Sequence, residues 1–374
     1  MPFDVTTNPR RPPRLAGTLA PMRLSNGYTP MLGSARIARQ WIRRRRQLRV
    51  LNEVYPAVTT SLALDPGWRV HRLLSTVGDV TVALVGGSAP AAVLKCARGV
   101  HGTAALDHSG AVVTTLSCDP RLTGWAHLLP RRLRTTRTPH GDLVVLEELL
   151  AGAEGRTAIT PATWEEVLAS VLTSIGDLHK CTAYETAIDR PLLNRWVEEP
   201  ITVLSRWYHA TGPSSRTPTL ERLREELYRG LEGREVRVGW IHGDLSPGNV
   251  LLEPGTHEVS GLLDWERASP IGLPEIDEIH MRLSIQMHVQ NRELGDLVCD
   301  FVGGRRDQLF LRGDVDPSLV LLTWLHHVSG VLAKSDRHST RGFWAARNVH
   351  MVLTCVEMTS SPLTDPGPFS RPGR

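Results

Sequence analysis

Two polar segments, each next to a short apolar run, constrain the fold of this chain more than any other feature. Residues 241–249 read IHGDLSPGN and are followed by the apolar residues 250–252. The apolar residues 261–263 lead into 264–266, which read DWE. If the two apolar runs pair as strands of a hairpin, the first polar segment ends beside the start of the second. The pattern therefore predicts two polar loops lying side by side.

The residue types in these loops suit phosphoryl transfer. Asn249 and Asp264 offer an amide oxygen and a carboxylate, the oxygen donors that Mg²⁺ prefers when it also binds phosphate. Asp244 supplies a further carboxylate that is free to accept a hydroxyl proton. Either tripeptide alone, HGD or DWE, is more often an ordinary turn or strand end. In this order, with apolar strands between them, they form the constellation of kinase-type phosphoryl transfer.

These segments resemble the aminoglycoside phosphotransferases and choline kinase-like small-molecule kinases, whose motifs are close to H-G-D-x-x-x-x-N and I-x-D-W/F-E. The resemblance covers about residues 65–355. It implies an α+β, bilobal protein kinase-like fold, with a small antiparallel β-sheet N-lobe and a mainly helical C-lobe. Its implied site residues are the catalytic Asp244, Asn249, Asp264 and Lys95, with Asn249 and Asp264 binding the metal, His242 bracing the loop, and Asp277 capping the next helix and holding the loop backbone.

Composition is that of a soluble globular protein. The 374 residues are 41% hydrophobic and 22% charged, no apolar run approaches the ~18 residues of a membrane span, and the N-terminus lacks the apolar core of a signal peptide. We therefore expect a cytoplasmic protein. The five cysteines are odd in number and include no C-x-x-C pair, which favours reduced thiols.

Charge divides the chain unevenly. Residues 1–49 hold 11 Arg and a single acid, about +10, which leaves −6 for the rest of a chain whose total is +4. We predict a basic leader over 1–49, an N-lobe over 50–147, a C-lobe over 148–359 and a disordered tail over 360–374. The leader pattern predicts a helix over 34–53. Its Arg-rich residues 36–49 either contact nucleic acid or an anionic surface or, the reading we favour, form a solvated helix packed on the N-lobe.

Three strands are predicted, beginning at Trp68, Asp79 and Ala91, and each is bounded by Gly, Pro or Asp. Lys95 ends the third strand, and the resemblance implies that it pairs the α- and β-phosphates of ATP. The chain has 40 Arg but only three Lys, so each lysine is worth inspection.

The N-lobe also departs from the family pattern. Its first strands carry no G-x-G-x-x-G segment. A helix is expected over 104–116, and the simplest alignment places Ser109 where the family has the Glu that pairs the strand lysine. Asp107 either substitutes for that Glu, or phosphate alone holds Lys95. The pattern of residues 142–150 predicts a strand that leads into the hinge between the two lobes. The resemblance implies that adenine binds to the backbone at Glu147, Glu148 and Leu149.

The C-terminal part predicts helices over 285–302, 317–334 and 341–358. Four ring-bearing residues in them either line an acceptor pocket or, the favoured alternative, pack in the core: Trp324, His326, His327 and Trp344.

The acceptor is expected to be a small molecule. Gly243 stands where protein kinases have the Arg of H-R-D, Ser246 where they have a loop lysine, and no A-P-E follows Asp264. A group of acids suits a cationic acceptor, although helix capping explains it at least as well: Glu266, Glu275, Asp277 and Glu278.

The sequence thus predicts an ATP- and Mg²⁺-dependent phosphotransferase that moves the γ-phosphate to a hydroxyl of an aminoglycoside, another antibiotic or a metabolite. The alternative is a pseudokinase-like nucleotide-binding or scaffold protein without turnover. It is favoured by the missing helix Glu, the missing Gly-rich loop and the basic leader.

Overall fold

The computed structural model describes residues 51–359, except 52–54, 57, 75–78, 139, 212–216, 312–313 and 335–341. The predicted leader over 1–49, with its Arg-rich residues 36–49, and the predicted tail over 360–374 lie outside the described residues. Of the helix predicted over 34–53, only Leu51 is described, and its side chain is buried.

A five-stranded antiparallel sheet forms the first lobe, in the order β1-β2-β3-β5-β4. Burial alternates along most of β2, whereas β3 is buried at all but one position, as expected for a strand covered on both faces. One face packs Ala83, Val85 and Leu94 against Leu51, Val58 and Leu62. The strands are β1 (Arg69–Leu74), β2 (Val80–Gly86), β3 (Ala92–Ala97), β4 (Arg132–Arg137) and β5 (Leu143–Glu148).

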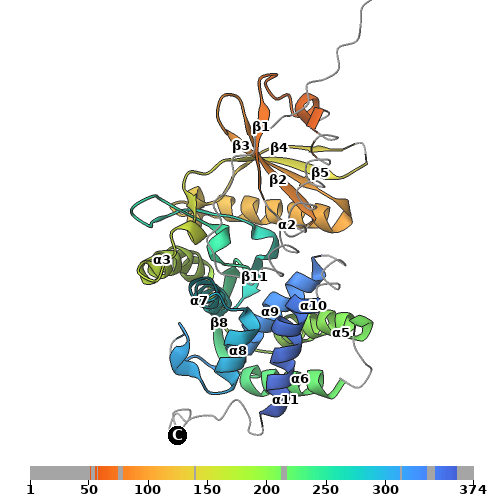
Figure 1. The fold of residues 1–374 in the computed structure, drawn as a ribbon, viewed down its shortest axis with the longest axis vertical. Coiled ribbons are helices and arrows are strands. Elements are labelled where there is room, and N and C mark those ends of the chain that lie inside the picture. The colour runs from red at the N-terminus through yellow and green to blue at the C-terminus, as the bar shows by residue number, and fades with distance from the viewer. Residues whose placement is uncertain are drawn as a thin grey trace, which may run out of the picture. The chain divides into compact units, whose positions relative to one another are not determined.

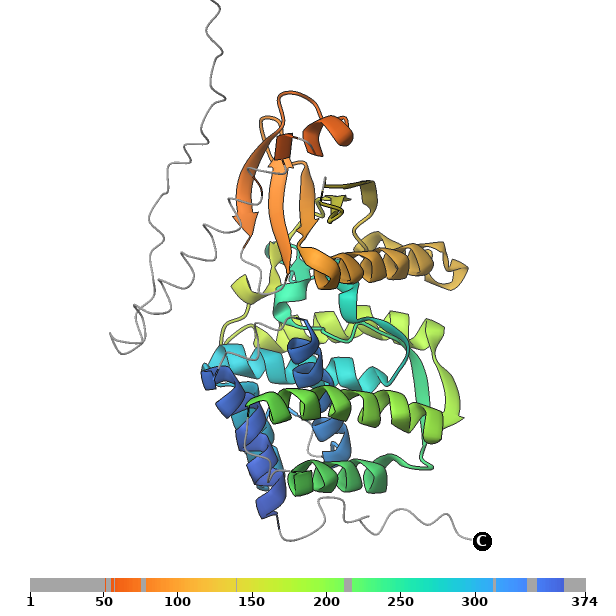
Figure 2. The same cartoon turned by 90° about the vertical axis from the view of Figure 1, so that its right-hand side faces the viewer.

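The other face of the sheet is covered by helix α2, Gly99–Cys118 (Figures 1 and 2). Its Leu106 packs against Leu143 and Val145 of β5 and Ala97 of β3. The helix is longer at both ends than the predicted range 104–116. Because α2 also contacts the short helical turn Trp265–Arg267, it connects the sheet lobe to the predicted metal-binding segment.

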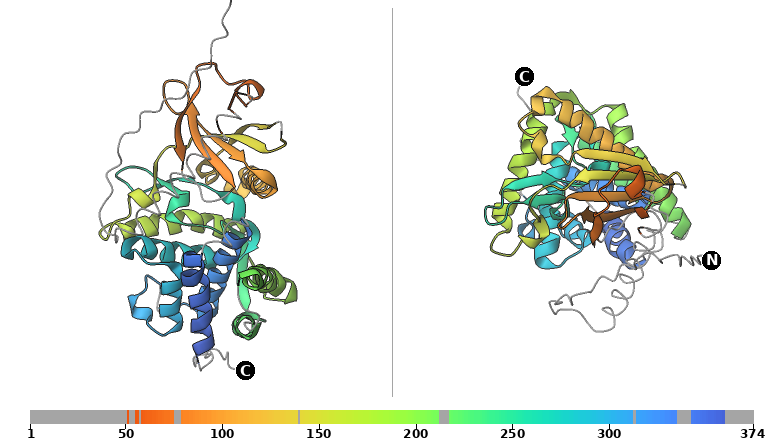
Figure 3. Two further views of the ribbon diagram at one scale, coloured as in Figure 1. Left: turned by 45° about the vertical axis from the view of Figure 1, so that its right-hand side comes forward. Right: turned by 90° about the horizontal axis from the view of Figure 1, so that it is seen from above.

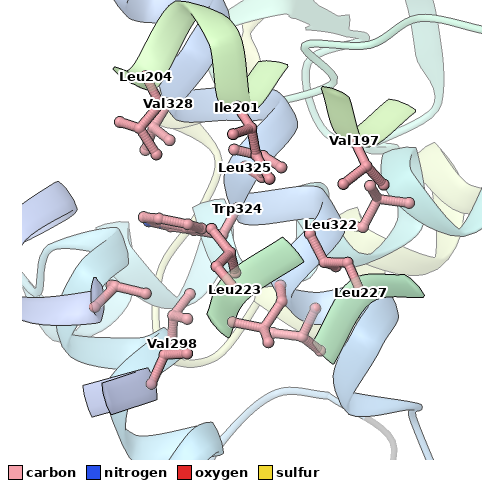
Figure 4. Close-up of a cluster of buried hydrophobic side chains, with 14 of the residues drawn as sticks. Val197, Ile201, Leu204, Leu223, Leu227, Val298, Leu322, Trp324, Leu325 and Val328 are labelled. Atoms are coloured by element: carbon pink, nitrogen blue, oxygen red, sulfur yellow. The ribbon is translucent and has the colours of Figure 1, made fainter. Parts of the chain in front are cut away.

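The second lobe is mainly helical and packs around α9. Trp324 of α9 is fully buried, and Figure 4 shows it with Leu322, Leu325 and Val328 among side chains of α5, α6 and α8. A helix that is apolar on all sides has to be buried in this way. The helices are α3 (Trp164–Thr182), α4 (Arg190–Leu193), α5 (Glu199–Thr211), α6 (Thr217–Leu231), α7 (Pro274–Gln290), α8 (Leu294–Val302), α9 (Pro317–Ala333), α10 (Gly342–Ala345) and α11 (Met351–Met358).

Two small sheets carry the polar loops. One has the order β10-β9-β6 and the other β11-β8-β7, both antiparallel. In Figures 1 and 3 the teal segment around residues 250–272 lies between the five-stranded sheet and the helices. The strands are β6 (Ala153–Glu154), β7 (Tyr184–Ala187), β8 (Glu235–Ile241), β9 (Val250–Leu252), β10 (Val259–Leu262) and β11 (Ser269–Gly272).

The single helix predicted over 285–302 is wrong. Helix α7 ends at Gln290 because Asn291 adopts a left-handed conformation (φ 53°), which Asn tolerates better than most residues. Helix α8 then begins at Leu294 with a capping box formed by Glu293 and Asp296. The described residues otherwise form the predicted α+β, two-lobed architecture. No helix among them has the length and apolarity to cross a membrane.

Candidate active site

The loop that follows β8 is fixed by a buried carboxylate. Asp277, fully buried in the first turn of α7, accepts hydrogen bonds from the backbone N–H groups of His242 (2.7 Å) and Gly243 (2.9 Å). His179 Nε2 donates to it at 3.1 Å. Burial alone would raise the pKa of Asp277, but the contacts with His179 and His242 lower it, so the carboxylate stays ionised. The predicted capping role of Asp277 is wrong, because α7 begins at Pro274 with Leu273 at the N-cap.

His242 joins this loop to the second polar segment. Its Nε2 donates to the carbonyl oxygen of Leu263 at 2.8 Å, and its ring lies 4.6 Å from that of Trp265, centroid to centroid. Gly243 has a positive φ of 73°, and a Cβ at this position would overlap the carbonyl oxygen of Arg267. The two polar segments therefore approach closely only because residue 243 has no side chain.

The same hairpin brings Asn249 and Asp264 together. Leu263 N–H donates to the carbonyl of Asn249 at 2.8 Å, and the Asn249 Nδ2 donates to the carbonyl of Asp244 at 2.9 Å. The amide oxygen of Asn249 is not used in either bond. Asp264 adopts a left-handed conformation (φ 61°, ψ 59°) and its side chain is 57% exposed. Such strain is common at functional sites, and the two oxygen donors fit Mg²⁺.

Lys95 of β3 pairs with a carboxylate that the sequence did not indicate. Its Nζ lies 2.8 Å from Glu147 Oε2 on the neighbouring strand β5 and 3.5 Å from Asp264 Oδ1. Burial alone would lower the pKa of Lys95, but Glu147 and Asp264 raise it above its usual value. Asp107 instead pairs with Arg137 at 3.9 Å on the surface. The suggestion that Asp107 substitutes for the helix Glu is therefore wrong.

The predicted adenine-binding residues lie at the end of β5. Glu147 is within the strand ladder, opposite Val93 and Arg132, and its side chain turns to Lys95. Glu148 forms an exposed ion pair with Arg131 at 2.9 Å. Leu149 is the first residue past the strand. Of the three residues predicted to bind adenine, only Leu149 therefore lies outside strand β5.

Asp244 has three basic neighbours. Lys334 Nζ lies 3.3 Å from its Oδ2, and His327 Nδ1 and Arg267 Nη1 lie 3.6 Å and 3.9 Å from its Oδ1. Burial would raise the pKa of Asp244, but His327, Arg267 and Lys334 outweigh it and hold the pKa well below the usual value. The carboxylate is therefore ionised at neutral pH, and its environment is more basic than sequence reasoning suggested.

Helix α9 supplies several of these contacts. Arg267 donates to the carbonyl oxygens of His326 and His327, and its guanidinium lies against Gly330, where any Cβ would overlap it. His326 Nε2 also donates to the carbonyl of Gly243 at 3.1 Å. The favoured core assignment of the four ring-bearing residues is confirmed for Trp324, which is buried in the hydrophobic core, and for Trp344, which is partly buried and packs against that core. It is wrong for His326 and His327, which contact Gly243 and Asp244 of the loop that follows β8.

Asp244, His280 and His327 also present ligand atoms within 4.8 Å of one another, a spacing compatible with a metal ion. However, Lys334 and Arg267 contact the same carboxylate. A divalent cation there would be repelled by two fixed positive charges. The donor set of Asn249 and Asp264 is the better candidate for a metal.

The environment of His280 predicts that the free energy of unfolding decreases at acid pH. It is buried, its Nδ1–H donates to the carbonyl of Leu245 at 2.9 Å, and burial, followed by the proximity of His327, lowers its pKa from 6.5 to about 3. Between these values the unfolded chain binds a proton that the native chain does not, so stability falls as pH drops. We expect His280 to contribute a loss of about 1.4 kcal/mol per pH unit below its unfolded pKa.

Urea unfolding at pH 7, 6 and 5 measures this effect. His280→Asn keeps a donor for Leu245 and removes the titrating ring, so its free energy of unfolding should fall less steeply with pH. Equal slopes for the wild type and the variant would contradict the assignment.

Comparisons with known proteins identify the family and the fold of the chain. The chain matches the model of the phosphotransferase enzyme family APH over residues 89–277. A thermostable mutant of aminoglycoside phosphotransferase APH(4)-Ia, apo form, superposes with a TM-score of 0.54 at 11% identity, covering 81% of this chain and 98% of that one. A ternary complex of a variant of the same protein with AMP-PNP and hygromycin B gives a TM-score of 0.54 at 13% identity, covering 80% and 98%.

A curated relative, acyl-CoA dehydrogenase family member 11 of Rattus norvegicus, is 25% identical over 126 residues. The match spans 33% of this chain and only 16% of that protein. The structural likenesses establish the protein kinase-like fold, and the family model covers half of the sequence, including both polar segments. The chain belongs to the APH phosphotransferase enzyme family.

Proposed function

We propose that this protein is a small-molecule kinase that transfers the γ-phosphate of ATP to a hydroxyl group. The observation that carries this proposal is the convergence of Lys95, from the sheet lobe, on Asp264 of the second polar segment at 3.5 Å. Asp264 follows Leu263, whose backbone N–H donates to the carbonyl of Asn249. The side chain of Asn249 in turn donates to the backbone carbonyl of Asp244. These groups are the parts that phosphoryl transfer requires.

In this mechanism each residue has a defined task. Backbone groups at the end of β5, from Glu147 to Leu149, bind adenine, and Lys95 holds the α- and β-phosphates. Asn249 and Asp264 would hold Mg²⁺, which when bound neutralises charge on the phosphate oxygens. Asp244 orients the acceptor hydroxyl and accepts its proton. Most of the acceleration comes from positioning and electrostatics.

The alternative of a nucleotide-binding protein without turnover loses part of its support. It rested partly on the missing Glu in the helix that is now α2. Glu147 supplies the carboxylate that holds Lys95, from a strand. A scaffold protein would have no need to retain Asp244, Asn249 and Asp264 in one loop system.

Turnover separates the two functions. With ATP, we expect one acceptor from a panel of neutral, anionic and amine-bearing hydroxyl compounds to be phosphorylated at about 1–100 s⁻¹, and EDTA to abolish the reaction. Asp264→Asn should raise the Mg²⁺ concentration needed for half-maximal rate, because the carboxylate is lost. Asn is the matched replacement because it tolerates the left-handed backbone of residue 264. ATP binding without any phosphorylated product would favour the binding protein.

A further inference from the structure

The ammonium group of Lys334 lies between two carboxylates next to Asp244. Lys334 follows the last residue of α9, and its Nζ is 2.6 Å from Glu266 Oε1 and 3.3 Å from Asp244 Oδ2. Its side chain is 29% exposed, against 23% for Glu266 and 17% for Asp244. Burial would lower the pKa of Lys334, but Asp244 and Glu266 raise it, so the group stays charged. A fixed cation therefore contacts one of the two carboxylate oxygens of the proposed base.

Two of the other acids that could attract a positively charged acceptor already have partners in the protein. Asp277 is fully buried and binds the loop backbone. Glu278 pairs with Arg282 at 2.8 Å along α7. Glu275 lies in the first turn of α7, where the free backbone amides favour a carboxylate, although its buried Oε2 has no hydrogen-bond partner. Asp277 and Glu278 are thus not available to an acceptor.

We propose that Lys334 fills the place beside Asp244 where an ammonium group of an acceptor would bind, so that the natural acceptor carries no ammonium group next to its reacting hydroxyl. This inference rests on the proposed function and names its substrate class. An aminoglycoside would have to displace Lys334 from both carboxylates or to place another positive charge beside Lys334 and Arg267. An acceptor with a neutral or anionic neighbour to its hydroxyl meets no such penalty and can accept a hydrogen bond from Lys334.

Hygromycin B is a suitable probe, because a protein of similar fold is seen bound to it. Removing the positive charge of Lys334 should make the site more receptive to an aminoglycoside.

The test is a calorimetric titration of hygromycin B into protein saturated with ADP and Mg²⁺. Lys334→Met keeps the unbranched stem and removes the charge, so its Kd should be lower than that of the wild type by about tenfold or more, the worth of one charge-assisted hydrogen bond. Lys180→Met is the matched control, because Lys180 is exposed on α3 and pairs only with Asp177 at 3.5 Å among the described residues. Its Kd should equal that of the wild type.

Two results would overturn the inference: equal Kd values for the wild type and both variants, or a wild type that binds hygromycin B more tightly than Lys334→Met. Lys334→Gln serves as the second variant if the Met variant does not fold. If ADP does not bind, the proposed function fails, and the titration is repeated without nucleotide. The same gain is expected there, since the contacts of Lys334 involve only protein groups.

Discussion

Asp244→Asn is expected to lower the turnover number about 10²–10⁴-fold, the usual contribution of a positioned general base, and to leave the Kd for ATP unchanged. Asn keeps the shape of the side chain but cannot accept the hydroxyl proton. Steady-state kinetics with the acceptor that the wild type phosphorylates, together with ATP titration, measure both quantities.

The low pKa of Asp244 makes this prediction more specific. Because His327, Arg267 and Lys334 keep the carboxylate ionised despite its burial, protonation of Asp244 should not produce an acidic limb in the wild-type rate profile between pH 5 and 8. Such a weak base suits a loose transition state, in which little proton transfer is needed until late. Asp177→Asn, an exposed charge-matched control, should retain full activity. Near wild-type turnover by Asp244→Asn would remove Asp244 from the chemistry.

Glu147→Ala is expected to destabilise the fold by about 3–5 kcal/mol, the cost of leaving one partner of a buried ion pair alone. The side chains of Lys95 and Glu147 are each only 9% exposed, so solvent cannot replace the lost carboxylate. The KM for ATP should also rise, because Lys95 is then positioned by Asp264 alone. Urea unfolding and ATP-dependent kinetics report the two effects.

Asp107→Ala is the matched control for this experiment. Asp107 is 52% exposed and lies 3.9 Å from Arg137, so its loss should cost less than about 1 kcal/mol. The pair of variants decides which element anchors the lysine. A large effect of Asp107→Ala, or a silent Glu147→Ala, would show that the carboxylate partner is in α2 after all.

The sequence was most informative where chemistry is local. Asp244, Asn249 and Asp264 lie within one hairpin, so their order and the apolar runs between them were enough to predict their proximity. Lys95 was found because it lies in a strand that can be recognised from its own residues, although β3 continues to Ala97 and does not end at Lys95 as predicted. Alternation and turn residues predicted β1, β2 and β3 for the same reason.

What the sequence could not give depends on packing between distant elements. Glu147 contacts Lys95 from the adjacent strand β5, about 50 residues further along the chain, whereas the alignment pointed to Ser109 in α2. His327 of α9 and Lys334 just after it reach Asp244 from about one quarter of the chain away. The spacing of His327 on a largely apolar helix suggested core packing. Only the scarcity of lysine singled out Lys334 in the sequence, and it did not indicate which residues Lys334 would contact.

Gly330 has a consequence for engineering this protein. Replacing glycine by alanine inside helices is a routine way to gain about 0.5–1 kcal/mol of stability. Gly176 in α3 suits that strategy, since an added Cβ would meet no atom within 4 Å. At Gly330 the same exchange would push the guanidinium of Arg267 off α9 and away from Asp244. A design rule based on helix propensity alone would treat the two positions as equivalent. At Gly330 it would gain helix stability and lose the contact of Arg267 with Asp244.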